Sequence, residues 1–89
     1  MAWTISYTET ALKQLRKLDR ATARRLVDFM DARIAPRSNP RSHGKALRGE
    51  EFAMLWRYRV GDYRLVCEIQ DGALLVLVVQ IGHRKDVYR

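Results

Sequence analysis

Three arginines occupy positions where two neighbouring β-strands would share one face. In residues 55–60, aromatic and aliphatic side chains alternate with Arg57 and Arg59, which is the two-residue period of a half-buried strand. Arg64 alternates with Leu65 and Cys67 in the same way, so pairing across Gly61-Asp62 would align the three arginines. Because a guanidinium grips phosphate through two parallel hydrogen bonds, the pattern predicts a phosphate-binding face. An ordinary solvated face, with its repulsion screened by salt, is the simpler alternative.

A second polar cluster closes the chain. The residues His83, Arg84, Lys85 and Tyr88 fall within a few positions of one another, directly after an apolar segment. A histidine beside two cations is a candidate for proton transfer. A polar tail with no chemical role is the alternative.

Cations, a histidine and a tyrosine suit one reaction in particular. RNA can be cut when its own 2′-hydroxyl attacks the adjacent phosphorus, which needs a base, an acid and cations for the phosphate oxygens. One cysteine and two histidines are too few for a structural zinc site, and few carboxylates converge to hold Mg²⁺. We therefore expect neither a metal nor another cofactor.

The composition agrees with an anionic partner. Seventeen Lys and Arg stand against ten Asp and Glu, giving a formal net charge of +7 over 89 residues. Residues 36–49 are rich in Pro, Ser, Asn and Gly, and they carry four cations before the first acid: Arg37, Arg41, Lys45 and Arg48. This segment is either a solvated linker or a basic arm that contacts phosphate.

The remaining patterns place these residues in a single domain spanning residues 1–89. Residues 3–7 alternate as a short strand, and Thr8 and Asp19 are the expected N-caps of two amphipathic helices joined as a hairpin. Pro36 ends the second helix, and three strands follow over residues 52–60, 63–69 and 73–81. Asp71-Gly72 predicts a two-residue turn before the last of these, whose apolar run favours a central strand covered on both faces. Cys67 is expected to be a small buried hydrophobe.

No segment is apolar enough to cross a bilayer, and the first residues do not resemble a signal peptide. The composition therefore predicts a cytoplasmic protein that does not bind membranes.

Two segments resemble a known family, the RelE toxins of type II toxin–antitoxin systems. Residues 56–66, WRYRVGDYRLV, are similar to its strand–turn–strand signature, and residues 81–88, IGHRKDVY, are similar to its C-terminal motif. Residues 11–18 and 45–49 fit the family as well, so the resemblance covers essentially the whole chain. It implies an α+β fold of order β-α-α-β-β-β, with a small, mostly antiparallel, twisted sheet packed on an N-terminal helical hairpin.

The resemblance also implies a function and partners. Similar proteins enter the ribosomal A site and cut mRNA without a metal by 2′-hydroxyl attack, which inhibits translation. They are neutralised by a cognate antitoxin, RelB-like or similar, in a toxin–antitoxin hetero-oligomer. The implied partners are thus the antitoxin, the ribosome and mRNA.

Roles for individual residues come from the same resemblance. Arg57 falls where the family supports the phosphate from a strand, and Arg64 falls where it contacts the phosphate or transition state. Arg84 matches a charge stabiliser or acid, and Tyr88 matches a tyrosine that stacks on, or helps deprotonate, the nucleotide. Further phosphate contacts are expected from Arg59, Lys45, Arg48 and Lys85.

Two departures leave the general base open. Leu55 stands where well-known members have lysine, and His83 stands at another lysine position. The base is then either Tyr88 or His83; a tyrosine would need a pKa well below its ordinary value of about 10, which clustered cations can supply.

Two other functions compete with RNA cleavage. A ParE-like toxin shares the fold but inhibits DNA gyrase and has no nuclease activity. A nucleic-acid-binding module without activity would use the same basic face.

Overall fold

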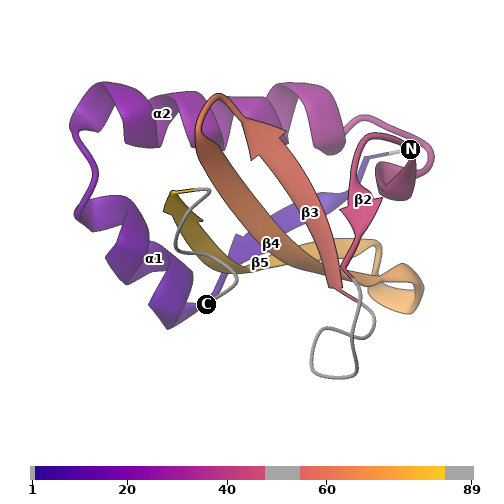
Figure 1. Cartoon of the computed structure of the whole chain (residues 1–89). Helices are drawn as coiled ribbons and strands as arrows, with labels where there is room; N and C mark the ends of the chain where they lie inside the picture. The colour runs from indigo at the N-terminus through magenta and orange to yellow at the C-terminus, as the bar shows by residue number, and fades with distance from the viewer. Residues whose placement is uncertain (1, 48–54, 84–89) are drawn as a thin grey trace.

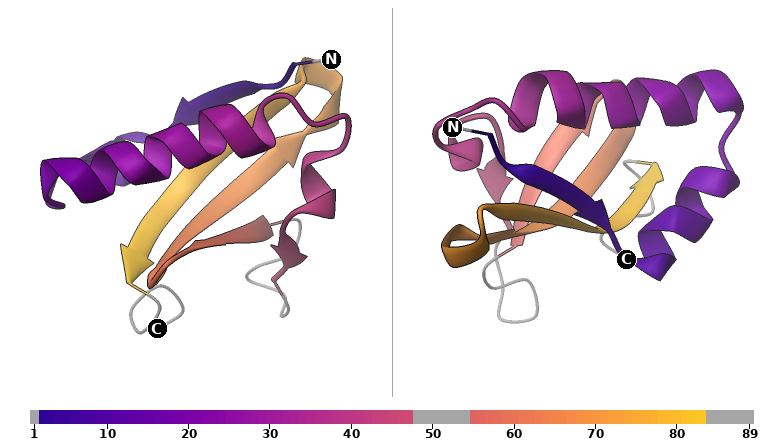
Figure 2. Two further views of the ribbon diagram at one scale, coloured as in Figure 1. Left: turned by 90° about the horizontal axis from the view of Figure 1, so that it is seen from above. Right: turned by 180° about the vertical axis from the view of Figure 1, so that it is seen from behind.

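The structure is a computed structural model in which residues 2–47 and 55–83 are described. They form an α+β fold with one five-stranded mixed sheet of order β1-β5-β4-β3-β2 (Figure 1). The strands are β1 (Thr4–Tyr7), β2 (Lys45–Ala46), β3 (Leu55–Val60), β4 (Tyr63–Gln70) and β5 (Leu75–His83). β1 pairs parallel with β5, and the other neighbours are antiparallel. The predicted fold class is confirmed, and the sheet is strongly twisted (Figure 2).

Both predicted helix caps are present. Thr8 Oγ1 accepts from the N–H of Ala11 at the start of α1 (Glu9–Arg16), and Asp19 accepts from the N–H of Thr22 at the start of α2 (Arg20–Phe29). A π-helical segment, η1 (Met30–Ile34), continues α2, and its last N–H bond runs from Ala35 to Met30. No helix in the described part of the chain is long and apolar enough to span a membrane.

The helices meet at a corner rather than lying side by side. α2 runs along one end of the sheet, and α1 lies across the end of β5 at a steep angle to it (Figures 1 and 2). Their apolar faces both cover the same side of the sheet: Ala11, Leu26 and Met30 belong to one buried cluster with Tyr58 and other strand residues. The sheet therefore has one helix-covered face and one that these helices leave open.

Two connections differ from the sequence-based expectation. β2 lies inside the segment 36–49, which the composition predicts to be a loop. Only two residues of β2 pair with β3, and so short a strand leaves no pattern in the sequence. The turn after β4 is not the predicted two-residue Asp71-Gly72 turn but a 3₁₀ turn, η4 (Asp71–Ala73), that ends at Leu74 with φ of 49°. A leucine in the left-handed region gives no signal in a sequence, since that conformation disfavours side chains.

A β-bulge interrupts the ladder between β4 and β5. Val66 pairs with Gln80 while Cys67 pairs with Val78, so Val79 is an extra residue. Thr8 stabilises the bulge, because its N–H donates to Val78 O at 3.0 Å and its hydroxyl donates to Val79 O at 3.2 Å. One extra residue moves every later side chain of the strand to the opposite face of the sheet. The side chains at the end of β5 therefore lie on the opposite face from the one that strict alternation predicts.

β5 lies between β1 and β4 as the predicted central strand. Its coverage is unequal, however, because Val76 and Val78 are fully buried whereas Leu75 and Leu77 are only half-buried. The apolar run thus marks a central strand that is closely packed on the helix-covered face alone.

Candidate nucleic-acid interface

The face of the sheet opposite the helices carries the cations predicted from the sequence. Lys45 lies directly across from Arg57, and Arg59 lies directly across from Arg64. Residues opposite one another on antiparallel strands point to the same side, so these four side chains share what we call the arginine face. The structure therefore brings together four of the predicted site residues, from β2, β3 and β4.

Part of the arginine face is more enclosed than expected. Arg64 is only 7% exposed and Val66 only 2% exposed, although the alternation predicts a solvated surface. The Nε atom of Arg57 is also buried and has no hydrogen-bond partner among the described residues. A partly dehydrated guanidinium interacts more strongly with an anion than one in bulk water, so this enclosure favours phosphate binding over a merely solubilising role.

Like charges placed directly opposite each other cost stability. A surface that concentrates charge in this way is suited to an anionic ligand.

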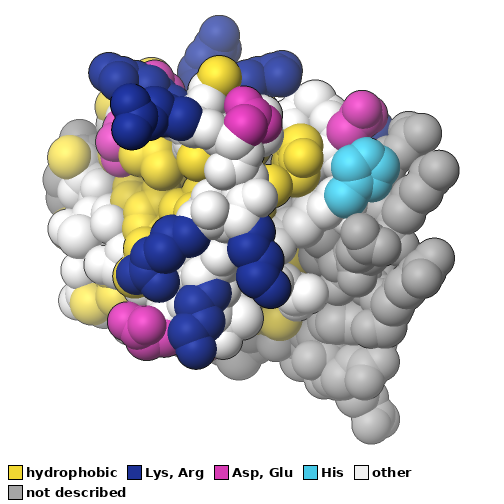
Figure 3. All heavy atoms as spheres, turned by 90° about the vertical axis from the view of Figure 1, so that its left-hand side faces the viewer, with side chains coloured by type: hydrophobic (Ala, Val, Ile, Leu, Met, Phe, Trp, Pro, Cys, Tyr) yellow, Lys and Arg dark blue, Asp and Glu magenta, His cyan; other side chains and the backbone are white. Residues whose placement is uncertain are grey.

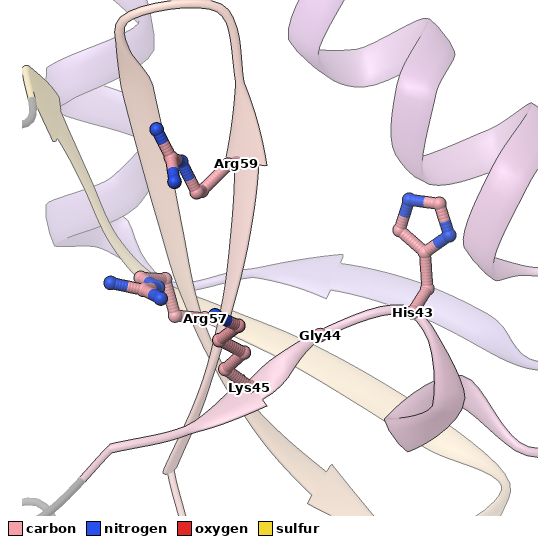
Figure 4. Close-up of a pocket in the computed structure, with 5 residues that line it drawn as sticks. All are labelled: His43, Gly44, Lys45, Arg57 and Arg59. Atoms are coloured by element: carbon pink, nitrogen blue, oxygen red, sulfur yellow. The ribbon is translucent and has the colours of Figure 1, made fainter.

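A hollow of about 220 Å³ opens at the edge of this face, lined by His43, Gly44, Lys45, Arg57 and Arg59 (Figure 4). The side chains of Arg57 and Arg59 extend to the same side of β3, whereas His43 points toward the helices (Figure 4). Gly44 is needed here, because a Cβ at this position would lie 2.8 Å from Arg57 O and 2.9 Å from Tyr58 Cε1. Glycine thus lets the β2 segment approach β3 closely enough to bring Lys45 beside Arg57.

Internal contacts hold the segment that contains Lys45. The Tyr58 hydroxyl donates to Pro40 O at 2.8 Å in the protein interior. Arg41 binds both carboxylate oxygens of Asp71, at 2.7 and 2.9 Å, and lies 5.8 Å from the centre of the Trp56 ring. Of the four cations in this segment, Arg41 therefore serves to fix the loop, while Lys45 lies on the arginine face.

The structure does not bring His83 together with the arginines. It lies opposite Tyr63 on β4, and the two rings meet edge to face at 5.7 Å between centroids. Tyr63 packs against the helix-covered core, so His83 lies on the helix-covered side. The bulge at Val79 is the cause, since strict alternation from Val78 would have placed His83 among the arginines.

Four predicted site residues lie outside the described residues: Arg48, Arg84, Lys85 and Tyr88. Their roles stay predictions. With His83 on the other side of the sheet, Tyr88 is the remaining candidate for the general base of the two that the sequence suggested.

Sequence analysis missed one residue at this site, His43. Arg37 donates to its Nδ1 at 2.9 Å, and its ring lies 5.3 Å from that of Phe29. Burial, followed by the charges of Arg37 and Arg33, lowers the pKa of His43 below its ordinary value. A lone histidine in a polar loop carries no periodic signal that would have revealed these contacts.

Burial disfavours ionisation of three groups in the described part of the chain: the thiol of Cys67 and the hydroxyls of Tyr7 and Tyr58. Burial raises the pKa of Cys67 above its ordinary range, in keeping with its predicted role as a buried hydrophobe, fully enclosed in the core. Burial also raises the pKa of Tyr7 to about 12 and shifts that of Tyr58 upward. None of these groups is suited to remove a proton near neutral pH.

Metal binding finds no support in the described part. Within residues 2–47 and 55–83, no three His, Cys, Asp or Glu side chains converge as ligands. That the reaction needs no metal remains a prediction from the sequence.

Comparison with known proteins identifies the family. A family model described as the ParE toxin of type II toxin–antitoxin systems, parDE, matches residues 5–88. The chain belongs to this RelE/ParE toxin superfamily. Within it the protein is a toxin of the RelE type, as the following relatives indicate.

Toxin RelG of Mycobacterium tuberculosis is 34% identical over 89 residues, covering 100% of this chain and 99% of that protein. The mRNA interferase toxin RelE of Escherichia coli is 29% identical over 85 residues, covering 96% of this chain and 86% of that protein. Among solved structures, the M. tuberculosis RelBE2 toxin–antitoxin complex aligns with a TM-score of 0.85 at 31% identity, covering 97% of this chain and 95% of that one. A RelE variant from E. coli bound to a RelB antitoxin peptide aligns with a TM-score of 0.72 at 28% identity, covering 93% and 84%.

Proposed function

We propose that this RelE-type toxin is an endoribonuclease that cuts translated mRNA in the ribosomal A site by 2′-hydroxyl attack. The observation that carries the proposal is the arginine face, where Arg59 lies directly opposite Arg64 and Arg57 lies one alternation away. Guanidinium groups so placed can hold a phosphodiester and stabilise the charge that develops on its equatorial oxygens. The name of the similar E. coli protein, an mRNA interferase toxin, agrees with this chemistry.

The roles divide between the described arginines and the C-terminal residues. Arg64, which is almost fully enclosed, contacts the scissile phosphate, and Arg57, Arg59 and Lys45 support the neighbouring backbone phosphates. Arg84 is the proposed charge stabiliser or acid, and Tyr88 is the proposed base. Arg48 and Lys85 would add phosphate contacts; all four of these latter residues lie outside the described part.

The proposed regulatory partner is a RelB-like antitoxin in a toxin–antitoxin hetero-oligomer, as in the similar complexes from M. tuberculosis and E. coli. The surface near α1 suits such a partner. Lys and Arg side chains surround an exposed hydrophobic area on this side of the molecule (Figure 3), and Lys13 and Arg16 of α1 and its C-cap residue Lys17 are exposed. An acidic amphipathic segment would match both features.

A gyrase-inhibiting toxin is the second candidate, and the ParE description of the matching family model favours it. The two candidates differ in what they damage. Brief expression in cells, with mRNA 5′ ends and DNA breaks mapped in the same samples, separates them. Cleavage in frame within translated mRNA is the expected result; intact mRNA with gyrase-linked DNA breaks would replace this proposal with the second.

A further inference from the structure

A second hollow lies beside the arginine face, where the sheet edge meets the end of α2. It is an open hollow of about 490 Å³ between α2, η1 and the β3–β4 turn, with a volume in the range of small-ligand sites. Nine residues line it: Arg25, Asp28, Phe29, Ala32, Arg33, His43, Arg59, Val60 and Gly61. We call it the turn groove.

The turn groove exists because β2 is short. In the described part of the chain β2 pairs only with Trp56 and Arg57, so no strand covers the outer edge of β3 beyond them. The N–H of Leu47 donates to Leu55 O at 3.0 Å, which shows that odd-numbered residues of β3 direct their backbone groups to this edge. The backbone N–H and C=O of Arg59 therefore face the turn groove.

Positive charge and hydrogen-bond donors converge on the groove. Arg25 and Arg33 are exposed on α2 and η1. The Arg25 guanidinium lies against Gly61, at 3.2 Å from where a Cβ would be, and the positive φ of 60° at Gly61 favours glycine. The one carboxylate, Asp28, is 3.9 Å from Arg24 outside the groove. The balance in the groove thus favours an anionic ligand.

The contacts of His43 indicate which of its ring nitrogens can donate a hydrogen bond. An arginine can only donate, so the 2.9 Å contact from Arg37 requires His43 Nδ1 to accept. The proton of the neutral imidazole then resides on Nε2, the other ring nitrogen. The Phe29 ring beside it, half-buried, adds an aromatic surface, and a flat ring with nearby donors is how proteins hold an unstacked base.

The two hollows share Arg59 and His43. A chain that passes from one to the other would keep a phosphate within reach of Arg59 throughout. We propose that the turn groove binds a further nucleotide of the single-stranded RNA held on the arginine face, with its phosphate between Arg25, Arg33 and Arg59 and its base against Phe29 and His43. This inference rests on the proposed function, because it assumes that the arginine face binds RNA.

The test compares two pairs of substitutions with the same change in charge. Arg25→Gln with Arg33→Gln removes two cations from the groove. Lys17→Gln with Arg20→Gln, the outer pair, removes two exposed cations from the junction of α1 and α2, away from the groove residues and from the Arg24–Asp28 ion pair. Affinity of the purified full-length toxin for a fluorescent single-stranded oligoribonucleotide is measured by anisotropy over a range of salt concentrations.

Loss of each phosphate contact reduces the slope of log affinity against log salt by about 0.7 for single strands, which is about fivefold in affinity at 0.1 M salt. The groove pair should therefore lose about 25-fold in affinity and about 1.4 in slope, and the outer pair should lose much less. Equal losses in both pairs, no loss in the groove pair, or no binding of the oligoribonucleotide by the wild type would each overturn the inference.

A second comparison tests the sign of the charge at one site. Ala32 lines the groove and is exposed, so Ala32→Lys should tighten RNA binding and Ala32→Glu should weaken it. Equal effects from the two variants would contradict the inference. If the groove pair weakens binding of a purified acidic antitoxin and leaves RNA affinity unchanged, the groove belongs to a protein partner and the inference is wrong.

Cleavage of mRNA on ribosomes, measured with the same proteins, separates this inference from the proposed function. A wild type that cuts mRNA, with a groove pair that binds RNA normally, refutes the turn groove alone. A wild type that binds RNA through the groove and cuts no mRNA refutes the proposed function alone.

Discussion

The two faces of the β3–β4 hairpin are made by alternate residues of the same strands, and they have opposite properties. Leu65 is fully buried against the helices, whereas its neighbour Arg64 lies on the other side opposite a second arginine. On β3, Tyr58 is anchored in the core beside Arg57 and Arg59. Residues that are adjacent in sequence thus have different roles: one stabilises the fold, and the next lies in the proposed RNA-cleaving site.

The two faces also differ in their effect on the stability of the folded state. The helix-covered face has apolar contacts that stabilise the folded state. The arginine face places like charges opposite one another, which destabilises the folded state. A bound anion would attract these charges and make their contribution to stability favourable. Substitutions on the two faces should therefore separate stability from activity.

The largest effect on stability is expected from Leu65→Ala. Loss of a fully buried leucine leaves a cavity and should lower the free energy of unfolding by about 2–5 kcal/mol. Chemical denaturation measures the loss. Cleavage per folded molecule should stay near the wild-type rate; a large fall at full folding would mean that the two faces are not separable.

Arg64→Ala should have the opposite profile. Removing one contact to the transition state should lower the rate of mRNA cleavage by about 10²–10³. The loss of the packed side-chain stem and of the hydrogen bond to Tyr63 O lowers the free energy of unfolding as well, but the folded protein should remain the dominant species, so the fall in rate per folded molecule is the larger effect. Single-turnover cleavage and denaturation measured on one preparation give both numbers. Unchanged cleavage would remove Arg64 from the site.

Arg59→Gln should raise stability slightly. Arg59 and Arg64 are directly opposite in the strand register, so removing one of the two like charges should add about 0.2–1 kcal/mol to the free energy of unfolding, and the gain should shrink as salt is added. Arg20→Gln, an exposed arginine on α2, is the matched control and should change little. A loss of stability in Arg59→Gln would show that the pair is not repulsive.

A small pH effect is expected from His43. Its pKa is lowered in the folded state, so the unfolded state binds the proton more readily as pH falls below about 6.5. Stability should be complete above that pH and decline below it, and His43→Gln should remove this component of the decline. Denaturation at about pH 7.5 and about pH 5.5 checks it; equal declines in both proteins would show that burial and the neighbouring arginines do not lower the pKa of His43 on folding.

Much of this division could be predicted from the sequence, because it depends on two-residue periodicity. Alternation alone places Arg57 and Arg59 on one face of the strand and Tyr58 on the other. The helix caps at Thr8 and Asp19 follow from the side-chain chemistry of these two residues. The family resemblance then predicted the fold class, which the structure confirms.

What the sequence could not predict depends on departures from periodicity. The extra residue at Val79 turns His83 away from the arginines, and the tertiary contacts that hold the bulge, from Thr8, are distant in sequence. The two-residue pairing of β2 is too short to leave a pattern. The enclosure of Arg64 depends on how the open face packs, which alternation does not specify.

The central claim is that the arginine face cuts RNA by attack of the 2′-hydroxyl. The most direct measurement is the chemical analysis of the 3′ ends produced when purified toxin acts on mRNA in ribosomes with an empty A site. In-line attack by the 2′-oxygen predicts fragments ending in a 2′,3′-cyclic phosphate or its 3′-phosphate hydrolysis product, absent with Arg64→Ala. Uncut mRNA, or fragments that end in a 3′-hydroxyl, would contradict the claim.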